Sequence, residues 1–120
     1  MKIAIPVVSD VKDTAVSDTF GRAAMFMVYD TEADASIYIQ NKASLSSGGA
    51  GIQAAQTVVD SEVSVLLTPQ LGGNAARVLK AAGIRLYKAQ PCLNARENLE
   101  RFTQGKLEAL EQIHEGFHRH

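Results

Sequence analysis

Residues 51–87 read GIQAAQTVVDSEVSVLLTPQLGGNAARVLKAAGIRLY. This stretch decides the fold because segments with the apolar spacing of helices alternate with short apolar runs typical of strands. Apolar residues recur at three- and four-residue spacing over 52–59 and 75–82, which predicts two helices. Short β-rich runs over 63–68 and 84–87 follow those helices and predict strands. Because crossovers within one sheet are right-handed in nearly all proteins, each of these strands should lie parallel to its predecessor.

The residues before this stretch predict three more strands and two long loops. Residues 2–8 are apolar and β-rich, as in a buried central strand, and a polar loop follows over 9–24. Residues 25–29 and 36–39 are short strand candidates on either side of a polar hairpin turn. A second loop over 41–51 then leads into the first helix. Loops of this length inside a small domain are usually functional or mobile.

The carboxyl-terminal part adds a third helix. Asn94, followed three residues later by Glu97, is an amino-terminal cap signal before an apolar helical stripe. The spacing of apolar residues also supports a last short helix within a tail over 106–120. The element order therefore predicts a single α/β domain over 1–105, with a mixed five-stranded sheet covered by helices.

Composition is that of an ordinary globular protein, with 120 residues, 46% hydrophobic and 21% charged. The net charge of −1 argues against binding to nucleic acid or to a membrane surface, since both need a strong basic field. No apolar run approaches the roughly 20 residues that cross a bilayer. The single cysteine, Cys92, excludes an internal disulfide and favours a reducing, cytoplasmic location. No long exposed apolar helix calls for a partner, so we expect a monomer.

Three loops are predicted to meet at one edge of the sheet. Residues 17–22 follow the first strand, 46–51 follow the third strand, and 70–74 follow the fourth strand. The predicted topology ends all three strands at the same edge, where the strand order reverses between the first and fourth strands. Ligands of open α/β sheets bind at such a reversal. A crevice formed by these loops is therefore the candidate site.

The chemistry of these loops suits an anion. Two of them run into helix amino termini, where unpaired backbone N–H groups and the helix dipole favour negative charge. Five glycines in the second and third loops let a ligand approach the main chain without an intervening β-carbon. Arg22 adds a positive charge, while Phe20 and Leu71 offer apolar walls. We expect a compact, soft or bulky anion held by many weak donors.

Four segments of the chain carry a family resemblance: MKIAIP (1–6), SDTFGRA (17–23), GGAGIQ (48–53) and GGNA (72–75). In this order they resemble the dinitrogenase iron–molybdenum cofactor biosynthesis family, which includes the NifX and NafY proteins and the carboxyl-terminal domain of NifB. The resemblance covers about residues 1–105. It implies a ribonuclease-H-like three-layer α/β/α fold and the binding and transfer of molybdenum- and iron-containing clusters.

Within this family the chain is most similar to the orange proteins of sulfate-reducing bacteria, which hold a molybdenum–copper sulfide cluster without covalent attachment. Many family members have a histidine where this chain has Thr19, and often another where it has Ser47. Direct histidine ligation by these loops is therefore excluded. The resemblance implies a non-catalytic carrier or storage protein that captures a complete anionic cluster, with a cluster donor or acceptor protein as its partner.

The loops and the resemblance together define the candidate cluster-binding residues. The set comprises Ser17, Thr19, Phe20, Gly21, Arg22, Ser47, Gly48, Gly49, Ala50, Gly51, Gln53, Gln70, Gly72, Gly73 and Asn74. No covalent metal ligand is expected among them. Cys92, after the last strand, and the pair His114 and His118, four residues apart in the tail, are secondary candidates for binding a metal.

Two other classes of function are alternatives to a carrier. A metal-free regulatory module would bind a partner protein or a small anion through the same glycine-rich edge. An enzyme has weaker support, because the dinucleotide-like pattern at 49–54 lacks a carboxylate near 70–75 and does not directly follow a strand. All three histidines lie in the tail, so the crevice lacks a base for nucleophilic catalysis. A nucleotide-binding enzyme would be stabilised against heat by a nucleotide.

Overall fold

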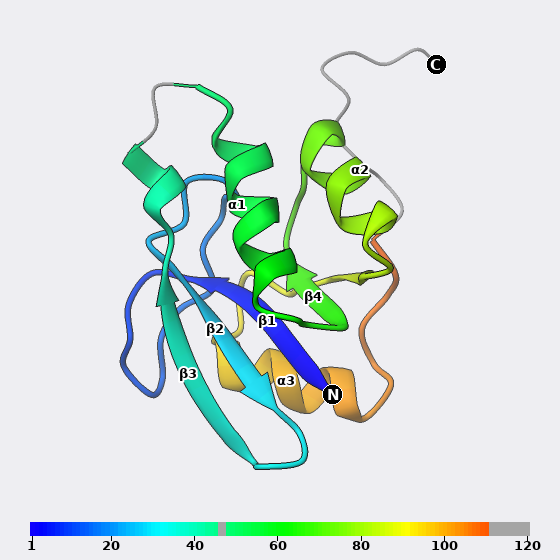
Figure 1. Ribbon diagram of the computed structural model, residues 1–120. Helices are drawn as coiled ribbons and strands as arrows, with labels where there is room; N and C mark the ends of the chain where they lie inside the picture. Colours follow the sequence, from blue (N-terminus) through cyan, green and yellow to red (C-terminus); the bar gives the residue numbers. More distant parts are fainter. Residues whose placement is uncertain (46–47, 111–120) are drawn as a thin grey trace.

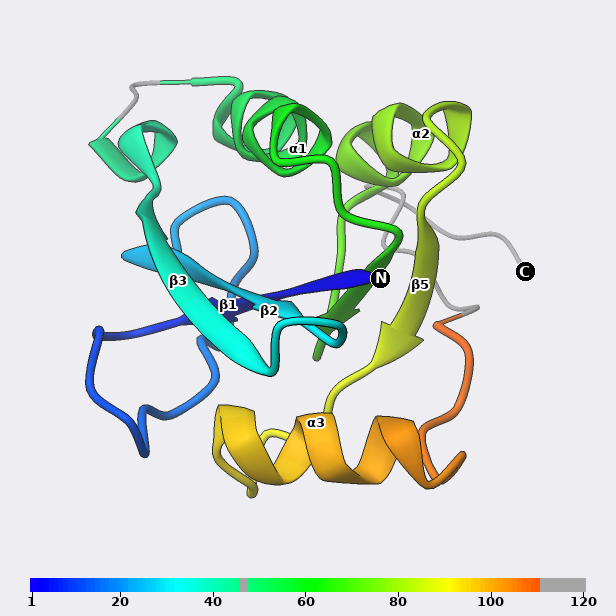
Figure 2. The ribbon, with the colours of Figure 1, turned by 60° about the horizontal axis from the view of Figure 1, so that its bottom comes forward.

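The computed structural model describes residues 1–45 and 48–110, which build a five-stranded sheet with helices on both faces (Figures 1 and 2). None of the helices in this part of the chain is long and apolar enough to cross a bilayer. In chain order the elements are β1 (Lys2–Val7), β2 (Met25–Asp30), β3 (Ala35–Gln40), the 3-10 helix η1 (Lys42–Leu45), α1 (Ala50–Asp60), β4 (Val65–Thr68), α2 (Gly73–Ala81), β5 (Arg85–Lys88) and α3 (Ala95–Thr103). The predicted order of strands and helices is confirmed.

The strands are arranged in the order β3-β2-β1-β4-β5. β1 pairs antiparallel with β2 and parallel with β4, so the strand order reverses between β1 and β4 as predicted. β2 and β3 form the antiparallel hairpin, and β4 and β5 run parallel. The sheet is therefore mixed, with the loops after β1, β3 and β4 at one edge.

Two cores lie on the two faces of the sheet. Ala4 and Leu66 face the layer of α1 and α2, whereas their neighbours Ile5 and Leu67 face the layer of α3. All four side chains are fully buried. Figure 2 shows α1 and α2 together on one face and α3 alone on the other. This is the predicted three-layer α/β/α arrangement.

The tail segment 106–110 is extended, which corrects the expectation of a helix in this part of the chain. The backbone N–H of Lys88 donates to the carbonyl of Glu108 at 2.8 Å, so the segment pairs with the outer edge of β5. Leu107 and Leu110 are buried in the two different cores. A three-residue spacing puts side chains on one face of a helix but on opposite faces of an extended chain. The remainder of the suggested helix lies outside the described residues.

Candidate functional site

A cleft of about 620 Å³ opens where the strand order reverses. Its walls come from the loop before β2, the start of α1, and the β4–α2 loop with the first turns of α2. The lining residues are Thr19, Phe20, Gly21, Gly49, Gly51, Ile52, Gln70, Leu71, Gly72, Gly73, Asn74, Ala75 and Arg77. The predicted convergence of three loops on one crevice is thereby confirmed.

Both helices that begin at the cleft start with a glycine. Gly49 is the N-cap residue of α1 and has a left-handed backbone (φ 70°), and Gly72 is the N-cap residue of α2. Neither N-cap residue supplies a side-chain cap to its helix. In contrast, α3 has a complete capping box formed by Asn94 and Glu97. The first-turn N–H groups of α1 and α2, which side chains usually satisfy, thus offer donors and a positive dipole end to an anion.

Apolar side chains form the floor and one rim of the cleft. Phe20 and Leu71 are buried, and the Phe20 ring packs against Phe26 with 5.3 Å between ring centroids. Ile52, on the first turn of α1, remains 46% exposed. An occupant of the cleft would therefore contact aromatic and aliphatic carbon beside the backbone donors. Such mixed walls suit a bulky, weakly hydrated anion better than a strongly hydrated one.

The positive charge of the cleft comes from Arg77. Among the described residues that line the cleft, it is the one ionisable side chain. It lies one turn into α2, and its Nη2 donates a hydrogen bond to Oδ1 of Asn74, which also lines the cleft. Arg77 is not among the residues predicted from the sequence, because it follows the glycine-rich segment. Its position three residues after Asn74, on the same helix face, was the available signal.

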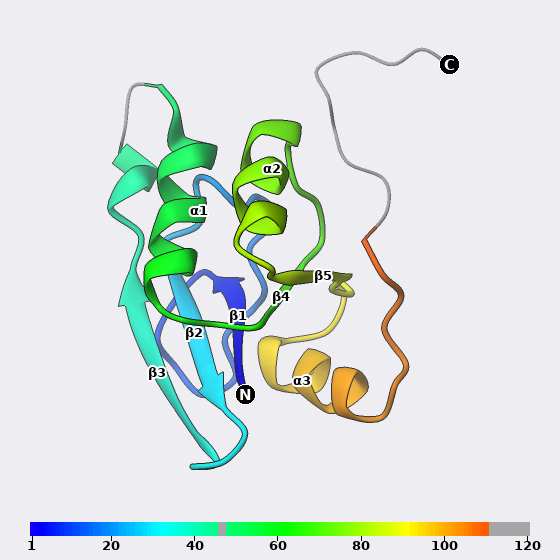
Figure 3. The same ribbon diagram turned by 45° about the vertical axis from the view of Figure 1, so that its right-hand side comes forward.

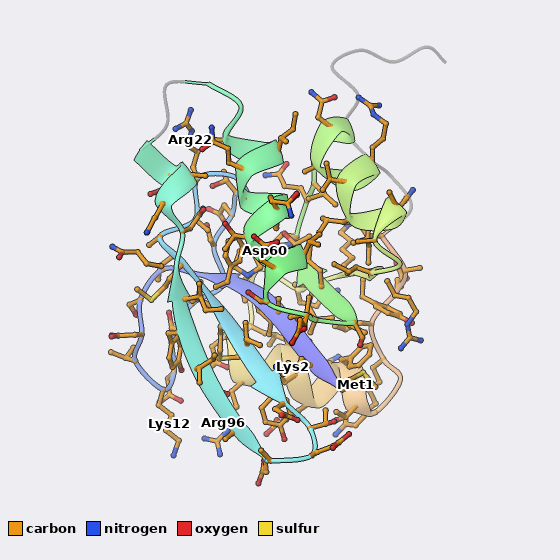
Figure 4. The ribbon with its side chains drawn as sticks, viewed as in Figure 1. Met1, Lys2, Lys12, Arg22, Asp60 and Arg96 are labelled. Atoms are coloured by element: carbon orange, nitrogen blue, oxygen red, sulfur yellow. The ribbon has the colours of Figure 1, made fainter. Side chains whose placement is uncertain are left out.

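Arg22, the cation chosen from the sequence, lies outside the cleft lining. Its Nη1 donates to the carbonyl of Ser44 at 3.1 Å, and Figure 4 shows the side chain beside η1. The contact joins the first loop to the second. Arg22 is thus placed to hold the loops together, and the lining charge is supplied from α2.

The other predicted residues divide between the lining and its surroundings. Those in the lining are Thr19, Phe20, Gly21, Gly49, Gly51, Gln70, Gly72, Gly73 and Asn74. The buried Ser17 hydroxyl donates to the carbonyl of Thr19 at 2.8 Å and so holds a turn. Ala50 is buried in the core, and Gly48 and Gln53 are exposed outside the lining. Ser47 lies outside the described residues.

No metal-binding cluster of protein side chains appears in the described part of the chain. Cys92 is exposed in the loop before α3, and no group of three or more His, Cys, Asp or Glu side chains that could hold a metal ion occurs among the described residues. His114 and His118 lie outside those residues. The described lining of the cleft thus supplies no His, Cys, Asp or Glu side chain.

Among the described residues, the ionisable groups whose pKa values are shifted lie in the β2–β3 hairpin, outside the cleft lining. The backbone N–H of Glu32 donates to the Asp30 carboxylate and lowers its pKa. The hydrogen bond between Tyr29 and Asp34 raises the pKa of the phenol. Both groups are at the surface, and neither reaches the cleft. Among the described residues, neither of the groups with a shifted pKa therefore belongs to the cleft lining.

Asn41, which is not among the site residues predicted from the sequence, fixes the first loop against the second. The residue is buried, and its Nδ2 donates to the carbonyls of Gly21 at 3.1 Å and Ala23 at 2.9 Å. Its Oδ1 accepts from the N–H of Ala43 at 3.2 Å. Three backbone groups of the two loops thus depend on one side chain.

Asn41→Ala should lower the free energy of unfolding by about 2 kcal/mol, because it removes the partner of two carbonyls and one N–H group. Urea unfolding followed by circular dichroism measures the change. Gln40→Ala, at the exposed neighbouring position, is the control and should change the value by less than about 0.5 kcal/mol. An unchanged midpoint for Asn41→Ala would contradict the role given to this side chain.

The chain is similar over most of its length to several known proteins. A family model described as dinitrogenase iron-molybdenum cofactor matches residues 1–105. The apo form of the orange protein from Desulfovibrio gigas superposes with a TM-score of 0.86 and 38% sequence identity, over 90% of this chain and 91% of that chain. A NifB-like protein from Thermotoga gives a TM-score of 0.81 and 33% identity, over 98% and 97% of the two chains. An uncharacterised protein of Methanocaldococcus jannaschii is 31% identical over 115 residues, 92% of each chain.

Proposed function

Because the chain belongs to the dinitrogenase iron-molybdenum cofactor family, we propose that it is a non-catalytic carrier or storage protein for an anionic metal–sulfur cluster. The observation that carries this proposal is the cleft, where two glycine-capped helix amino termini, an apolar floor and Arg77 meet. Family membership supports a role with metal clusters in cofactor biosynthesis.

The donor set of the cleft fits a cluster that arrives complete. In such a cluster the bridging sulfides already satisfy the metals, so the protein need supply only hydrogen-bond donors, positive charge and a partly dry surface. The described lining offers these and contains no carboxylate, imidazole or thiol. The same set fits a bare metal cation poorly, because backbone N–H groups and a guanidinium repel it.

As the occupant we propose a molybdenum–copper sulfide cluster. The similarity to the Desulfovibrio gigas orange protein supports this choice. The lining residue Thr19, at the position where many relatives have a histidine, supports non-covalent capture. The partners would then be the proteins that deliver the cluster and receive it.

Arg77→Gln should weaken cluster retention about tenfold, because one charge close to an anion in a partly solvated cleft contributes about 1.4 kcal/mol. Lys80→Gln removes the same charge from an exposed position of α2 outside the lining and should change retention less than about twofold. The measurement is anaerobic titration with a preformed molybdenum–copper sulfide cluster, followed by gel filtration and elemental analysis. Equal losses in the two variants would show that the charge acts through the overall field and not within the cleft.

A further inference from the structure

The chain covers one edge of its sheet and leaves the other open. At the β5 edge, residues 106–110 add an antiparallel segment. At the opposite edge, β3 pairs with β2, and no other described segment pairs with it. Figure 3 shows β3 at the margin of the molecule. The outward N–H and C=O groups of β3 are thus available to another strand.

β3 lacks the features that commonly prevent edge-to-edge pairing. Its sequence, ASIYIQ, contains neither charge nor proline. The pairing of β3 with β2 runs through six consecutive residues without a bulge. Ile37, near its centre, is 60% exposed. Natural edge strands are usually protected by charged residues, proline, a bulge or a covering segment, so an open edge of this kind favours association.

We propose that β3 pairs antiparallel with β3 of a second copy of this chain, around a two-fold axis perpendicular to the sheet. Such an axis keeps equivalent faces of the two sheets on the same side. Side chains alternate between the faces along a strand, so an odd-numbered residue lies opposite an odd-numbered residue of the second copy, and an even-numbered residue opposite an even-numbered one. In the register centred on Tyr38, Ile37 lies opposite Ile39 of the second copy. Apolar side chains on the α1–α2 face then meet across the axis.

The charges that flank β3 agree with this register. Asp34 precedes the strand and Lys42 follows it, and both residues are exposed. Asp34 lies in the β2–β3 turn, where its carboxylate also accepts from the Tyr29 hydroxyl, and Lys42 is the first residue of η1. The antiparallel two-fold arrangement brings these two ends of the strands together, so each Asp34 lies near Lys42 of the other copy and two pairs of opposite charge result. This self-complementarity is the reason for choosing a second copy as the occupant of the edge.

The pairing should be weak. One strand pair buries less than the roughly 1,200–2,000 Å² of a stable interface, so we expect a dissociation constant on the order of 100 µM. The monomer expected from the sequence is then the form that predominates at low protein concentration. The pairing uses the open edge of both copies, and residues 106–110 cover the other edge of each. Association should therefore stop at the dimer.

Sedimentation equilibrium of the whole protein between 10 µM and 1 mM tests the proposal. The weight-average mass should rise from 12.9 kDa toward twice that value. Ile37→Lys should weaken association at least tenfold, whereas Val11→Lys, at a position 57% exposed outside the strands, should leave it unchanged. The proposal would be overturned if the wild-type protein stayed monomeric at 1 mM or formed oligomers larger than a dimer. Equal effects of the two variants on association would also overturn it.

A charge swap tests the register independently of folding effects at Ile37. Asp34→Lys should weaken the dimer several-fold by placing like charges close together, and the double variant Asp34→Lys with Lys42→Asp should restore it. Recovery in the double variant supports the antiparallel two-fold pairing. A double variant that associates as poorly as Asp34→Lys alone would overturn this register.

Discussion

Gly72→Asp should reduce cluster retention at least about 100-fold while leaving the protein as stable as the wild type. Gly72 is the N-cap residue of α2, with the extended backbone (φ −78°, ψ 160°) that N-cap residues of any type adopt. An aspartate there would accept from the first-turn N–H groups and complement the helix dipole, so stability should change by only a few tenths of a kcal/mol. The same carboxylate would occupy the donors that the anion needs and would repel its charge.

Gly72→Asn separates charge from shape. Asparagine caps a helix in the same way and has nearly the same size, so this variant should be as stable as Gly72→Asp and should lose less than about tenfold in retention. Thermal unfolding of the apo forms and anaerobic cluster titration provide the two readouts. Full retention in Gly72→Asp would contradict anion binding at the start of α2. Equal losses in both variants would indicate steric blocking.

Gly21→Ala should lower the free energy of unfolding by about 3 kcal/mol and weaken cluster retention as well. A β-carbon at Gly21 would lie 3.0 Å from the backbone N of Gly51, 3.2 Å from its Cα and 3.3 Å from the carbonyl carbon of Ala50. These are backbone atoms at the start of α1, so they cannot turn aside as a flexible side chain would. The first loop would have to move away from α1, and the cleft that lies between them would change shape.

Gly48→Ala is the matched control, in the neighbouring glycine-rich loop. A β-carbon at Gly48 would have no atom within 4 Å, and its backbone is not left-handed. Its stability should therefore stay within about 0.5 kcal/mol of the wild type. Guanidinium unfolding measures both variants. A stable Gly21→Ala protein, or an equal loss in Gly48→Ala, would contradict the close approach of the first loop to α1.

The parts of the fold that depend on local pattern and general topology could be predicted from the sequence. The change of period over 51–87 located α1, β4, α2 and β5 to within a few residues. The Asn94 and Glu97 signal corresponds to a complete capping box. The right-handed crossover rule then placed three distant loops at one edge, and the cleft is found there.

The residues that the sequence did not place correctly depend on packing between distant segments. Arg22 is next to a glycine turn in the sequence, but it bonds to Ser44, 22 residues away, outside the cleft lining. Arg77 enters the lining because α2 is oriented with its start at the cleft. The extended segment 106–110 forms because the β5 edge offers hydrogen-bond partners. Of these three relations, the position of Arg77 three residues after Asn74 leaves a helical spacing in the sequence, and the other two leave none.

Backbone amide NMR of the 15N-labelled protein, titrated anaerobically with a preformed molybdenum–copper sulfide cluster, tests the central claim most directly. Because the proposed donors are the N–H groups at the starts of α1 and α2, saturation at a fixed ratio should shift the amides of 49–52 and 72–75 most. Elemental analysis of the same sample should find the metals with the protein. A spectrum unchanged by the cluster, or shifts centred on the exposed loop around Cys92, would contradict binding in the cleft.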